Sequence, residues 1–459
     1  MEQEKSNSLG PRLPRAVANL PASVMTCALQ ALLLVDAGMH VQQSLAVLLP
    51  ALFPQTETDA RWQNKKNLCS DLVYGYLRAE LRIMAIVQSV LRQKKKLPRP
   101  MLLILGLAIF SLLLQDRHAD HAVVHESVDM VRRLYGGVLA GLANACLRTV
   151  QRRRDSYADV DFYRKKFSLD AFDAAALFHA VPCHVARHWR SAYGQQAALH
   201  LLRRSSQRPW SAFRINAKHD AAAALRSALH SLGAEKVADW GLAFPPGSVP
   251  QRVLGREFAF WLREGALSQQ AAGSQRVLES LGLYHWEGSV CDFCAGFGGK
   301  TAALLEQGVA VTLCLDKSEQ RLRGLPRECR RLGLLPPVLA VADGTRPPLS
   351  GWNGHILLDA PCSGLGVLSR RPDIRRRVPS SFESYRQEQI RLLCAAYALL
   401  PPGRQIAYVT CTVNPEENEQ VVFHLLQAEP KSRLVRQWQT GHEHPWHEGM
   451  YGALVEKVF

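Results

Sequence analysis

The chain has 459 residues, of which 47% are hydrophobic and 21% charged, and these ordinary values exclude a protein that is disordered throughout. Its 56 lysine and arginine residues outnumber 40 aspartate and glutamate residues, and the formal charge of +16 favours a polyanionic partner, although a merely solvated basic surface would carry the same charge. The 11 cysteines show no short repeating spacing, which argues against a disulfide framework.

No segment indicates export or membrane insertion. The first residues, MEQEKSNSLGPRLPR (1–15), are polar and lack the apolar stretch of a secretory signal. The longest apolar run, MLLILGLAIFSLLL (101–114), is too short to span a bilayer and predicts a buried helix. We therefore expect a cytoplasmic protein without membrane contact.

Residues 1–150 predict an all-α domain. Apolar residues recur at helical spacing in segments 20–38, 67–91 and 128–154, and a helical bundle would bury these stripes. No catalytic constellation is visible there, so binding or scaffolding is the expected role. Its basic segments suit contact with RNA phosphates but are equally compatible with solvated faces.

Residues 151–245 predict a small mixed α/β linker domain that contributes to RNA binding. The segment from 208 to 235 indicates a strand, a turn and a helix. Basic and aromatic side chains alternate along this strand at Arg208, Trp210, Phe213 and Arg214. Such a pattern suits stacking on bases and holding phosphates. The alternative is a strand with core aromatic residues, which fits Phe213 at least as well.

Residues 246–459 alternate strands with helices, which is typical of an α/β domain with a mostly parallel sheet. The strand-like runs are VCDFCA (290–295), VTLCLDKS (311–318), VLAVADGT (338–345), HILLDAPC (355–362) and QIAYVTC (405–411). Each run ends in polar or reactive residues. Open parallel sheets place their ligand sites at that edge.

A glycine-rich turn after the first of these strands indicates a nucleoside site. Gly296, Gly298 and Gly299 let the backbone approach a ligand at the start of a helix, in a spacing unlike that of dinucleotide or Walker A loops. Asp316 ends the second strand, where a carboxylate can bind both hydroxyls of a ribose, and Asp343 can hold an adenine amino group. S-adenosylmethionine, a nucleoside without a pyrophosphate, fits best.

Two cysteines, Cys362 and Cys411, end the fourth and fifth strands. A lone cysteine is usually a small core residue, but these strands are neighbours in such a sheet, so both thiols would open onto one cleft. Carbon 5 of cytosine becomes nucleophilic only after a thiolate adds at carbon 6, and its proton has to be removed afterwards. One cysteine to attack and a second to assist release fit methylation at that carbon.

The residues from Gly265 to Phe459 resemble the RNA cytosine-5 methyltransferase family, most specifically in DAPCSG (359–364) and TCTVNPEENE (410–419). The branch of small-subunit ribosomal RNA methyltransferase B also has a NusB-like helical domain, which residues 1–150 resemble. The resemblance implies a Rossmann-like class I methyltransferase domain over 246–459. It would be preceded by an all-α NusB-like domain and a small mixed α/β linker domain.

The resemblance also implies roles for individual residues. The wall of the cofactor pocket would consist of Cys294, Ala295, Gly296, Phe297, Gly298, Gly299 and Lys300. Asp316 would bind the ribose and Asp343 the adenine of S-adenosylmethionine, and Asp359 would lie near both cofactor and cytosine. Cys411 would be the nucleophile and Cys362 would assist product release.

The cofactor loop departs from the family's sequence at two positions, and a CxxC pair precedes it. Phe297 stands where the family has proline and Gly296 where it has alanine, so the cofactor loop can differ in shape. Cys291 and Cys294 form a CxxC, but no second CxxC or histidine pair accompanies them, and we expect no metal site.

The expected partner is RNA, ribosomal RNA first, and the expected state is a monomer. Transfer RNA and large-subunit ribosomal RNA stay open as substrates. A non-catalytic RNA-binding role in ribosome assembly is a second alternative. A DNA cytosine-5 methyltransferase is a third, and it would attack with Cys362 instead of Cys411.

Overall fold

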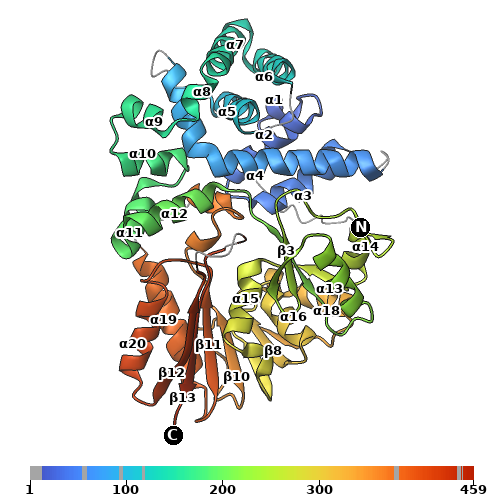
Figure 1. Cartoon of the computed structure of the whole chain (residues 1–459), viewed down its shortest axis with the longest axis vertical. Coiled ribbons are helices and arrows are strands. Elements are labelled where there is room, and N and C mark those ends of the chain that lie inside the picture. The colour runs from blue at the N-terminus through green and yellow to red at the C-terminus, as the bar shows by residue number, and fades with distance from the viewer. Residues whose placement is uncertain are drawn as a thin grey trace, which may run out of the picture. The chain divides into compact units, whose positions relative to one another are not determined.

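The computed structural model describes residues 13–53, 59–91, 97–115, 119–376, 382–441, 446 and 448–459. Its contacts divide the chain into two compact units, Met1–Ser206 with Arg375–Arg377, and Gln207–Ile374 with Val378–Phe459 (Figure 1). The helical unit thus extends beyond residue 150. The boundaries of the three expected domains stay a prediction.

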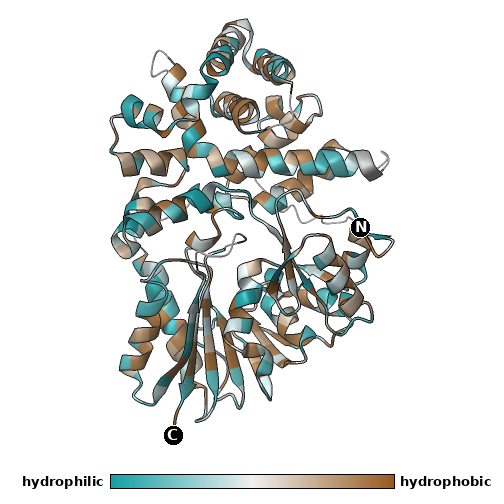
Figure 2. Ribbon diagram, viewed as in Figure 1, coloured by the Kyte–Doolittle hydropathy of each residue, from teal (hydrophilic) through white to brown (hydrophobic). Residues whose placement is uncertain are grey.

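The first unit is helical over its described residues. Its helices are α1 (Arg15–Ala18), α2 (Val24–Asp36), α3 (Val41–Leu52), α4 (Asp59–Val90), α5 (Arg99–Leu114), α6 (Asp120–Tyr135), α7 (Gly137–Arg152), α8 (Arg154–Tyr157), α9 (Val160–Phe167), α10 (Ala171–Phe178), α11 (Cys183–Tyr193) and α12 (Gln195–Ser206). Helix α5 is apolar along most of its length, as its brown colour in Figure 2 shows, and it packs against α2, α4, α6 and α7. Among the described residues, no helix combines the length and hydropathy that crossing a bilayer requires.

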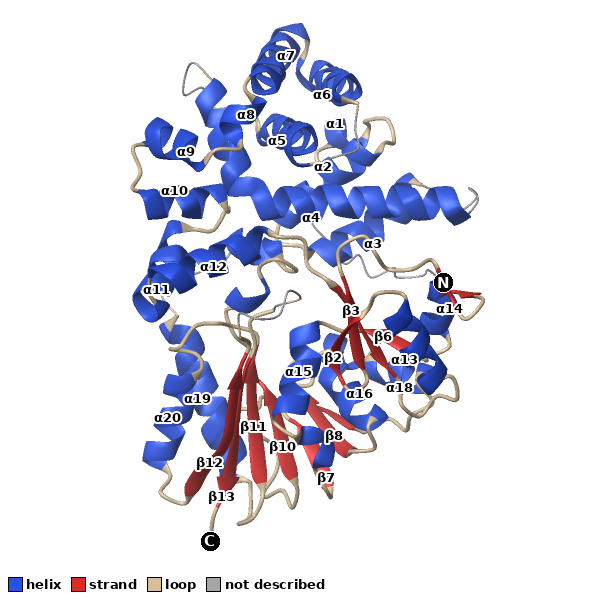
Figure 3. Cartoon of the chain, viewed as in Figure 1, coloured by secondary structure: helices blue, strands red, loops and turns tan. Residues whose placement is uncertain are grey.

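The second unit begins with a four-stranded antiparallel sheet in the order β2-β3-β1-β6 (Figure 3). Its strands and the elements around them are β1 (Ser211–Ile215), α13 (Ala222–Ser231), β2 (Glu235–Ala238), β3 (Gly241–Phe244), β4 (Arg252–Val253), β5 (Arg256–Glu257), α14 (Phe258–Arg263) and β6 (Leu267–Gln269). Phe213 is buried in the core of this sheet, as the alternative interpretation of its segment predicted.

A seven-stranded sheet follows, in the order β12-β13-β11-β10-β7-β8-β9. Its strands are β7 (Ser289–Asp292), β8 (Ala310–Asp316), β9 (Val338–Val341), β10 (His355–Asp359), β11 (Gln405–Thr410), β12 (Ser432–Gln439) and β13 (Tyr451–Lys457). The five predicted strands are confirmed, and they pair in parallel. The antiparallel strands β12 and β13 were not predicted.

Helices cover both faces of this sheet. The remaining elements are α15 (Ala272–Ser280), η1 (Leu283–His285), α16 (Gly299–Glu306), α17 (Glu319–Leu322), α18 (Leu325–Arg331), η2 (Leu365–Val367), η3 (Pro372–Arg376), α19 (Glu383–Ala398) and α20 (Glu419–Ala428). Alternate strand residues face opposite sides: Leu357 packs with α15, α16 and α18, whereas Ile356 and Leu358 pack with α19 and α20. The central strands are therefore packed on both faces, and their carboxyl ends are where a site can form.

Candidate active site

The two predicted cysteines meet at the carboxyl ends of β10 and β11. These strands pair in parallel, with Asp359 opposite Val409, so the predicted neighbourhood of the two strands is confirmed. The sulfur atoms of Cys362 and Cys411 lie 3.3 Å apart, and the backbone N–H of Cys411 donates to the sulfur of Cys362 over 3.4 Å. Both side chains are half-buried, so the sulfur pair is enclosed but not sealed from solvent.

The contact between the thiols makes them electrostatically unequal. The hydrogen bond from Cys362 lowers the pKa of Cys411 despite the opposing effect of burial, and the ammonium of Lys300 lowers it further. The same contact, burial and the carboxylate of Glu417 raise the pKa of Cys362 well above its usual value. Cys411 is therefore the thiol that ionises first, and Cys362 remains a protonated donor beside it.

The lowered pKa of Cys411 predicts how its alkylation rate depends on pH. The thiolate fraction of Cys411 rises as the pH rises through its pKa, so a lowered pKa moves the half-maximal alkylation rate to lower pH. Replacing Cys362 by alanine removes the hydrogen-bond donor and is expected to move this midpoint to higher pH. Peptide mass spectrometry after timed iodoacetamide treatment measures the rate at Cys411.

Cys394 supplies an internal control in the same digest. Burial raises the pKa of Cys394, so its midpoint is expected above that of Cys411 in the wild type and unchanged in Cys362→Ala. A midpoint of Cys411 that stays in place or falls after the substitution would contradict the assigned hydrogen bond.

Lys300 and Asp359 form an ion pair beside the cysteines. The ammonium nitrogen lies 2.5 Å from Oδ2 of Asp359, with the lysine side chain 10% exposed and the aspartate side chain 33% exposed. Burial lowers the pKa of Lys300, but the charge and hydrogen bond of Asp359 outweigh that effect and raise it. Lys300 thus stays charged and fixes the Asp359 carboxylate at the end of β10.

The glycine turn lies between β7 and α16, against the end of β8. Gly296 and Gly298 have φ angles of +56° and +77°, which glycine adopts at low cost, and a Cβ on Gly298 would lie 2.3 Å from Leu325. The backbone N–H of Gly296 donates to Oδ2 of Asp316 over 2.9 Å. The predicted loop and the predicted ribose-binding acid are therefore in direct contact.

The other predicted pocket residues lie at different depths. Cys294 is half-buried and Ala295 is buried, whereas Phe297 is 73% exposed. Gly299 is exposed at the start of α16. Asp343, two residues beyond the end of β9, is exposed and accepts hydrogen bonds from Thr345, which hold its pKa low. No contact described by the structure joins it to the other predicted site residues.

Glu417 was not singled out from the sequence, yet it ties the two cysteine-bearing loops together. Its buried carboxylate accepts the backbone N–H of Ser363 over 2.8 Å and the hydroxyl of Ser363 over 2.5 Å. It also accepts from Asn414 over 3.0 Å and from Gln389 over 3.1 Å. The available signal was its place in TCTVNPEENE, only six residues after Cys411.

We expect Glu417→Ala to destabilise the protein by about 3 kcal/mol, because it leaves several buried donors without an acceptor. Urea unfolding of the full chain measures this change. The exposed Glu319, which pairs with Arg323 over 2.9 Å, is the control, and Glu319→Ala is expected to cost less than about 0.5 kcal/mol. Equal losses in both variants would contradict the assigned role of Glu417.

The prediction that Arg214 contacts bases or phosphates is wrong. Its side chain is buried and pairs with Glu306, because the strand turns this position toward α16 instead of solvent. Arg208 is exposed and Trp210 half-buried, and their predicted role stays a prediction. Within the described residues, no group of three or more His, Cys, Asp or Glu side chains is arranged to hold a metal ion.

Known proteins are similar to this chain in sequence and fold. The family model for the 16S rRNA methyltransferase RsmB/F matches residues 284–450, and the NusB family model matches residues 24–152. A Vibrio cholerae protein named ribosomal RNA small subunit methyltransferase B is 30% identical over 416 residues, which cover 85% of this chain and 89% of the relative. An Escherichia coli protein of the same name is 30% identical over 425 residues, which cover 90% and 92%.

The solved structure of the protein PH0851 has a TM-score of 0.72 at 18% identity and covers 96% of this chain and 99% of its own, which shows a shared fold. These matches confirm the predicted fold class, with a NusB-like helical domain before a Rossmann-like domain. They also confirm the predicted enzyme class, an S-adenosylmethionine-dependent RNA methyltransferase. The chain belongs to the RsmB/F family of 16S rRNA methyltransferases.

Proposed function

We propose that this enzyme methylates carbon 5 of a cytosine in small-subunit ribosomal RNA through a covalent bond to Cys411. The observation that carries the proposal is the pair of sulfur atoms 3.3 Å apart, with the pKa of Cys411 lowered and that of Cys362 raised. A nucleophile alone would need one thiol, whereas assisted release needs a second group at this distance. The names of the relatives and the charge of +16 support ribosomal RNA as the partner.

The glycine turn fits S-adenosylmethionine. A Cβ on Gly296 would lie 4.0 Å from Oδ2 of Asp316, so glycine leaves space beside the carboxylate that would bind the ribose. Asp343 would hold the adenine, and the loop from Cys294 to Lys300 would form the wall of the pocket. When bound, S-adenosylmethionine supplies a methyl group on a positively charged sulfur, which is a good leaving group.

The protein's own groups carry out the addition to the ring. The Cys411 thiolate adds to carbon 6 of the cytosine, and the ring electrons move toward carbon 5 and nitrogen 3. Asp359, fixed by Lys300, holds the ring on its nitrogen 3 side by accepting a hydrogen bond from the amino group, and the ammonium of Lys300 offsets the negative charge that develops there. Carbon 5 then accepts the methyl group.

Release reverses the addition. Water that reaches the partly exposed site takes the proton from carbon 5, the double bond to carbon 6 forms again, and the carbon–sulfur bond breaks with its electron pair on Cys411. The S–H of Cys362 donates a hydrogen bond to this leaving sulfur, which lowers the cost of the returning charge. A protonated Cys362 suits this task and a thiolate would not.

The proposal is tested with purified protein, methyl-labelled S-adenosylmethionine and unmodified small-subunit ribosomal RNA. We expect labelled 5-methylcytidine on nucleoside analysis, and no comparable label in transfer RNA or large-subunit ribosomal RNA. If only transfer RNA or only large-subunit ribosomal RNA were labelled, that RNA would be the substrate instead of small-subunit ribosomal RNA. N4-methylcytidine, or no methylation of any RNA, would contradict the proposed reaction. A cytoplasmic location and a monomeric enzyme belong to the same proposal.

A further inference from the structure

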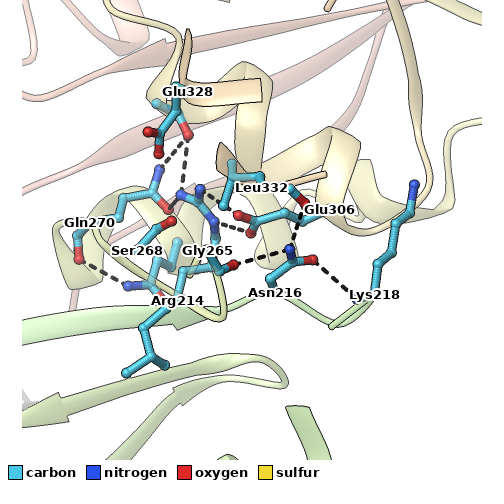
Figure 4. A network of polar contacts seen from close by, with 12 residues as sticks. Arg214, Asn216, Lys218, Gly265, Ser268, Gln270, Glu306, Glu328 and Leu332 are labelled. Atoms are coloured by element: carbon cyan, nitrogen blue, oxygen red, sulfur yellow. Dashed lines mark hydrogen bonds and ion pairs between the residues drawn. The ribbon is translucent and has the colours of Figure 1, made fainter. Parts of the chain in front are cut away.

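A buried arginine of the four-stranded sheet binds both ends of the helix that follows the glycine turn. Arg214 on β1 is 4% exposed, and its Nε and Nη2 pair with the two carboxylate oxygens of Glu306, the last residue of α16 (Figure 4). Its remaining nitrogen, Nη1, lies 3.3 Å from the carbonyl oxygen of Gly299, the first residue of that helix. One guanidinium group therefore holds the start and the end of α16.

Gln270 completes this contact from the other side. Its Oε1 accepts from Nη1 of Arg214 over 2.8 Å, while its Nε2 donates to the Gly299 carbonyl over 3.1 Å. The carbonyl of Gly299 thus receives two side-chain donors from outside its own helix. Arg214 lies on β1, and Gln270 directly follows β6. The four-stranded sheet therefore binds the peptide that leads from the glycine turn into α16.

Attachment of the small sheet alone does not require this charge pair. Asn216 lies on the same side and joins the sheet to the end of α18 through the carbonyl of Leu332 over 3.0 Å, and it also binds the carbonyl of Gly265 over 3.2 Å (Figure 4). Burying an arginine and a glutamate costs desolvation that apolar residues of similar volume would avoid. What sets Arg214 apart from Asn216 is its bond to the glycine turn.

The Gly299 peptide is a sensitive place for such a bond. Gly296 and Gly298 give the turn backbone freedom that other residues lack, so its shape depends on external contacts. The next residue, Lys300, binds Asp359 over 2.5 Å. A shift of the Gly299 carbonyl would therefore move both the wall of the cofactor pocket and the ion pair beside the cysteines.

We propose that Arg214 is a positioning residue for the S-adenosylmethionine pocket: through Gly299 it holds the glycine turn in the shape that binds the cofactor, with Glu306 as its charge partner. This inference rests on the proposed function, because it takes the turn to be the cofactor loop. Arg214 acts through the backbone and touches neither substrate nor reacting atoms. It links the four-stranded sheet with the cofactor site.

The test uses a double variant, Arg214→Met with Glu306→Met, in the full chain. Removing Arg214 alone would leave a buried carboxylate unpaired and could unfold the protein, whereas removing both charges preserves volume and neutrality. We expect a melting temperature near that of the wild type. The Kd for S-adenosylmethionine, measured by calorimetry, is expected to rise about tenfold, the scale of one or two lost hydrogen bonds. KM for the cofactor should rise with it, and kcat should fall less.

Arg214→Lys provides a second variant that keeps the charge opposite Glu306. A single ammonium group cannot reproduce the fork that reaches Glu306, Gln270 and Gly299 together, so a weaker rise in Kd is expected with the fold retained. Asn216→Ala is the matched control, since it removes a buried contact of the same sheet without touching the glycine turn. Its Kd is expected within about twofold of the wild-type value.

The outcomes separate the two proposals. If the wild type binds S-adenosylmethionine and the folded double and lysine variants bind it equally well, Arg214 has no positioning role and the proposed function stands. An equal loss in Asn216→Ala would also overturn the positioning role, because loosening of the sheet would then explain the effect. If the wild type itself does not bind S-adenosylmethionine, the proposed function fails and this inference fails with it.

Discussion

Replacing Cys411 with alanine is expected to abolish methylation and the covalent RNA adduct together, with the methylation rate reduced at least about 10⁴-fold. Replacing Cys362 with alanine is expected to leave adduct formation in place and to stall release. The reason is the difference in pKa between the two thiols. Cys411, whose pKa is lowered, attacks the ring, and Cys362, whose pKa is raised, donates a hydrogen bond to the departing sulfur.

A denaturing protein gel with radiolabelled small-subunit ribosomal RNA and S-adenosylmethionine measures both effects. Cys362→Ala should give a slow-migrating protein–RNA band that disappears when Cys411 is also replaced. Cys394→Ala, a half-buried cysteine on α19 away from the strand ends, is the control and should behave as wild type. Equal loss of the adduct in both single variants would remove the assigned division of roles.

Replacing Asp359 with asparagine is expected to lower the single-turnover methylation rate by about 10²–10³-fold, the cost of losing the group that orients the ring and fixes the Lys300 ammonium beside the developing negative charge. Asparagine keeps the shape of the side chain but loses the charge that pairs with Lys300 over 2.5 Å. The ammonium would then lack its partner, and the ring would lose its fixed contact on the nitrogen 3 side. Rapid-quench measurements at saturating cofactor report this step.

Asp343→Asn provides a contrast within the same pocket. Asp343 is exposed and lies beyond β9, where the proposal gives it contact with the adenine and none with the cytosine. Its replacement should raise KM for S-adenosylmethionine and leave the single-turnover rate at saturation within about threefold. A loss of rate at Asp343 as large as that at Asp359 would contradict the assignment of Asp359 to the chemical step.

The position of the cysteine pair was predictable from the sequence because it follows from topology. Parallel strands joined by helices place their carboxyl ends at one edge, so residues that end successive strands meet although they are far apart in the chain. Cys362, Cys411 and Asp359 all obey this rule, and so does the contact of Asp316 with Gly296. The pattern of apolar runs was sufficient to predict the strands that carry them.

Arg214 and Glu417 were beyond this kind of prediction. An arginine between apolar residues in a strand has the same local pattern whether it faces RNA or a buried carboxylate, and its partner Glu306 lies 92 residues further along the chain. The role of Glu417 depends on Ser363, 54 residues before it. Strand β12 was missed because it is largely exposed and has a polar sequence, without the apolar run that marked the parallel strands. Strand β13 was missed although most of its residues are buried.

Mapping which cysteine carries the cytosine tests the roles of Cys411 and Cys362 most directly. Wild-type enzyme is incubated with S-adenosylmethionine and small-subunit ribosomal RNA containing 5-fluorocytidine, in which carbon 5 has no proton to lose after methyl transfer, so the adduct persists. Nuclease and protease digestion followed by tandem mass spectrometry locates the attached nucleotide. We expect the nucleotide on Cys411, with Cys362 unmodified. A nucleotide on Cys362, the order expected of a DNA-type enzyme, would contradict these roles.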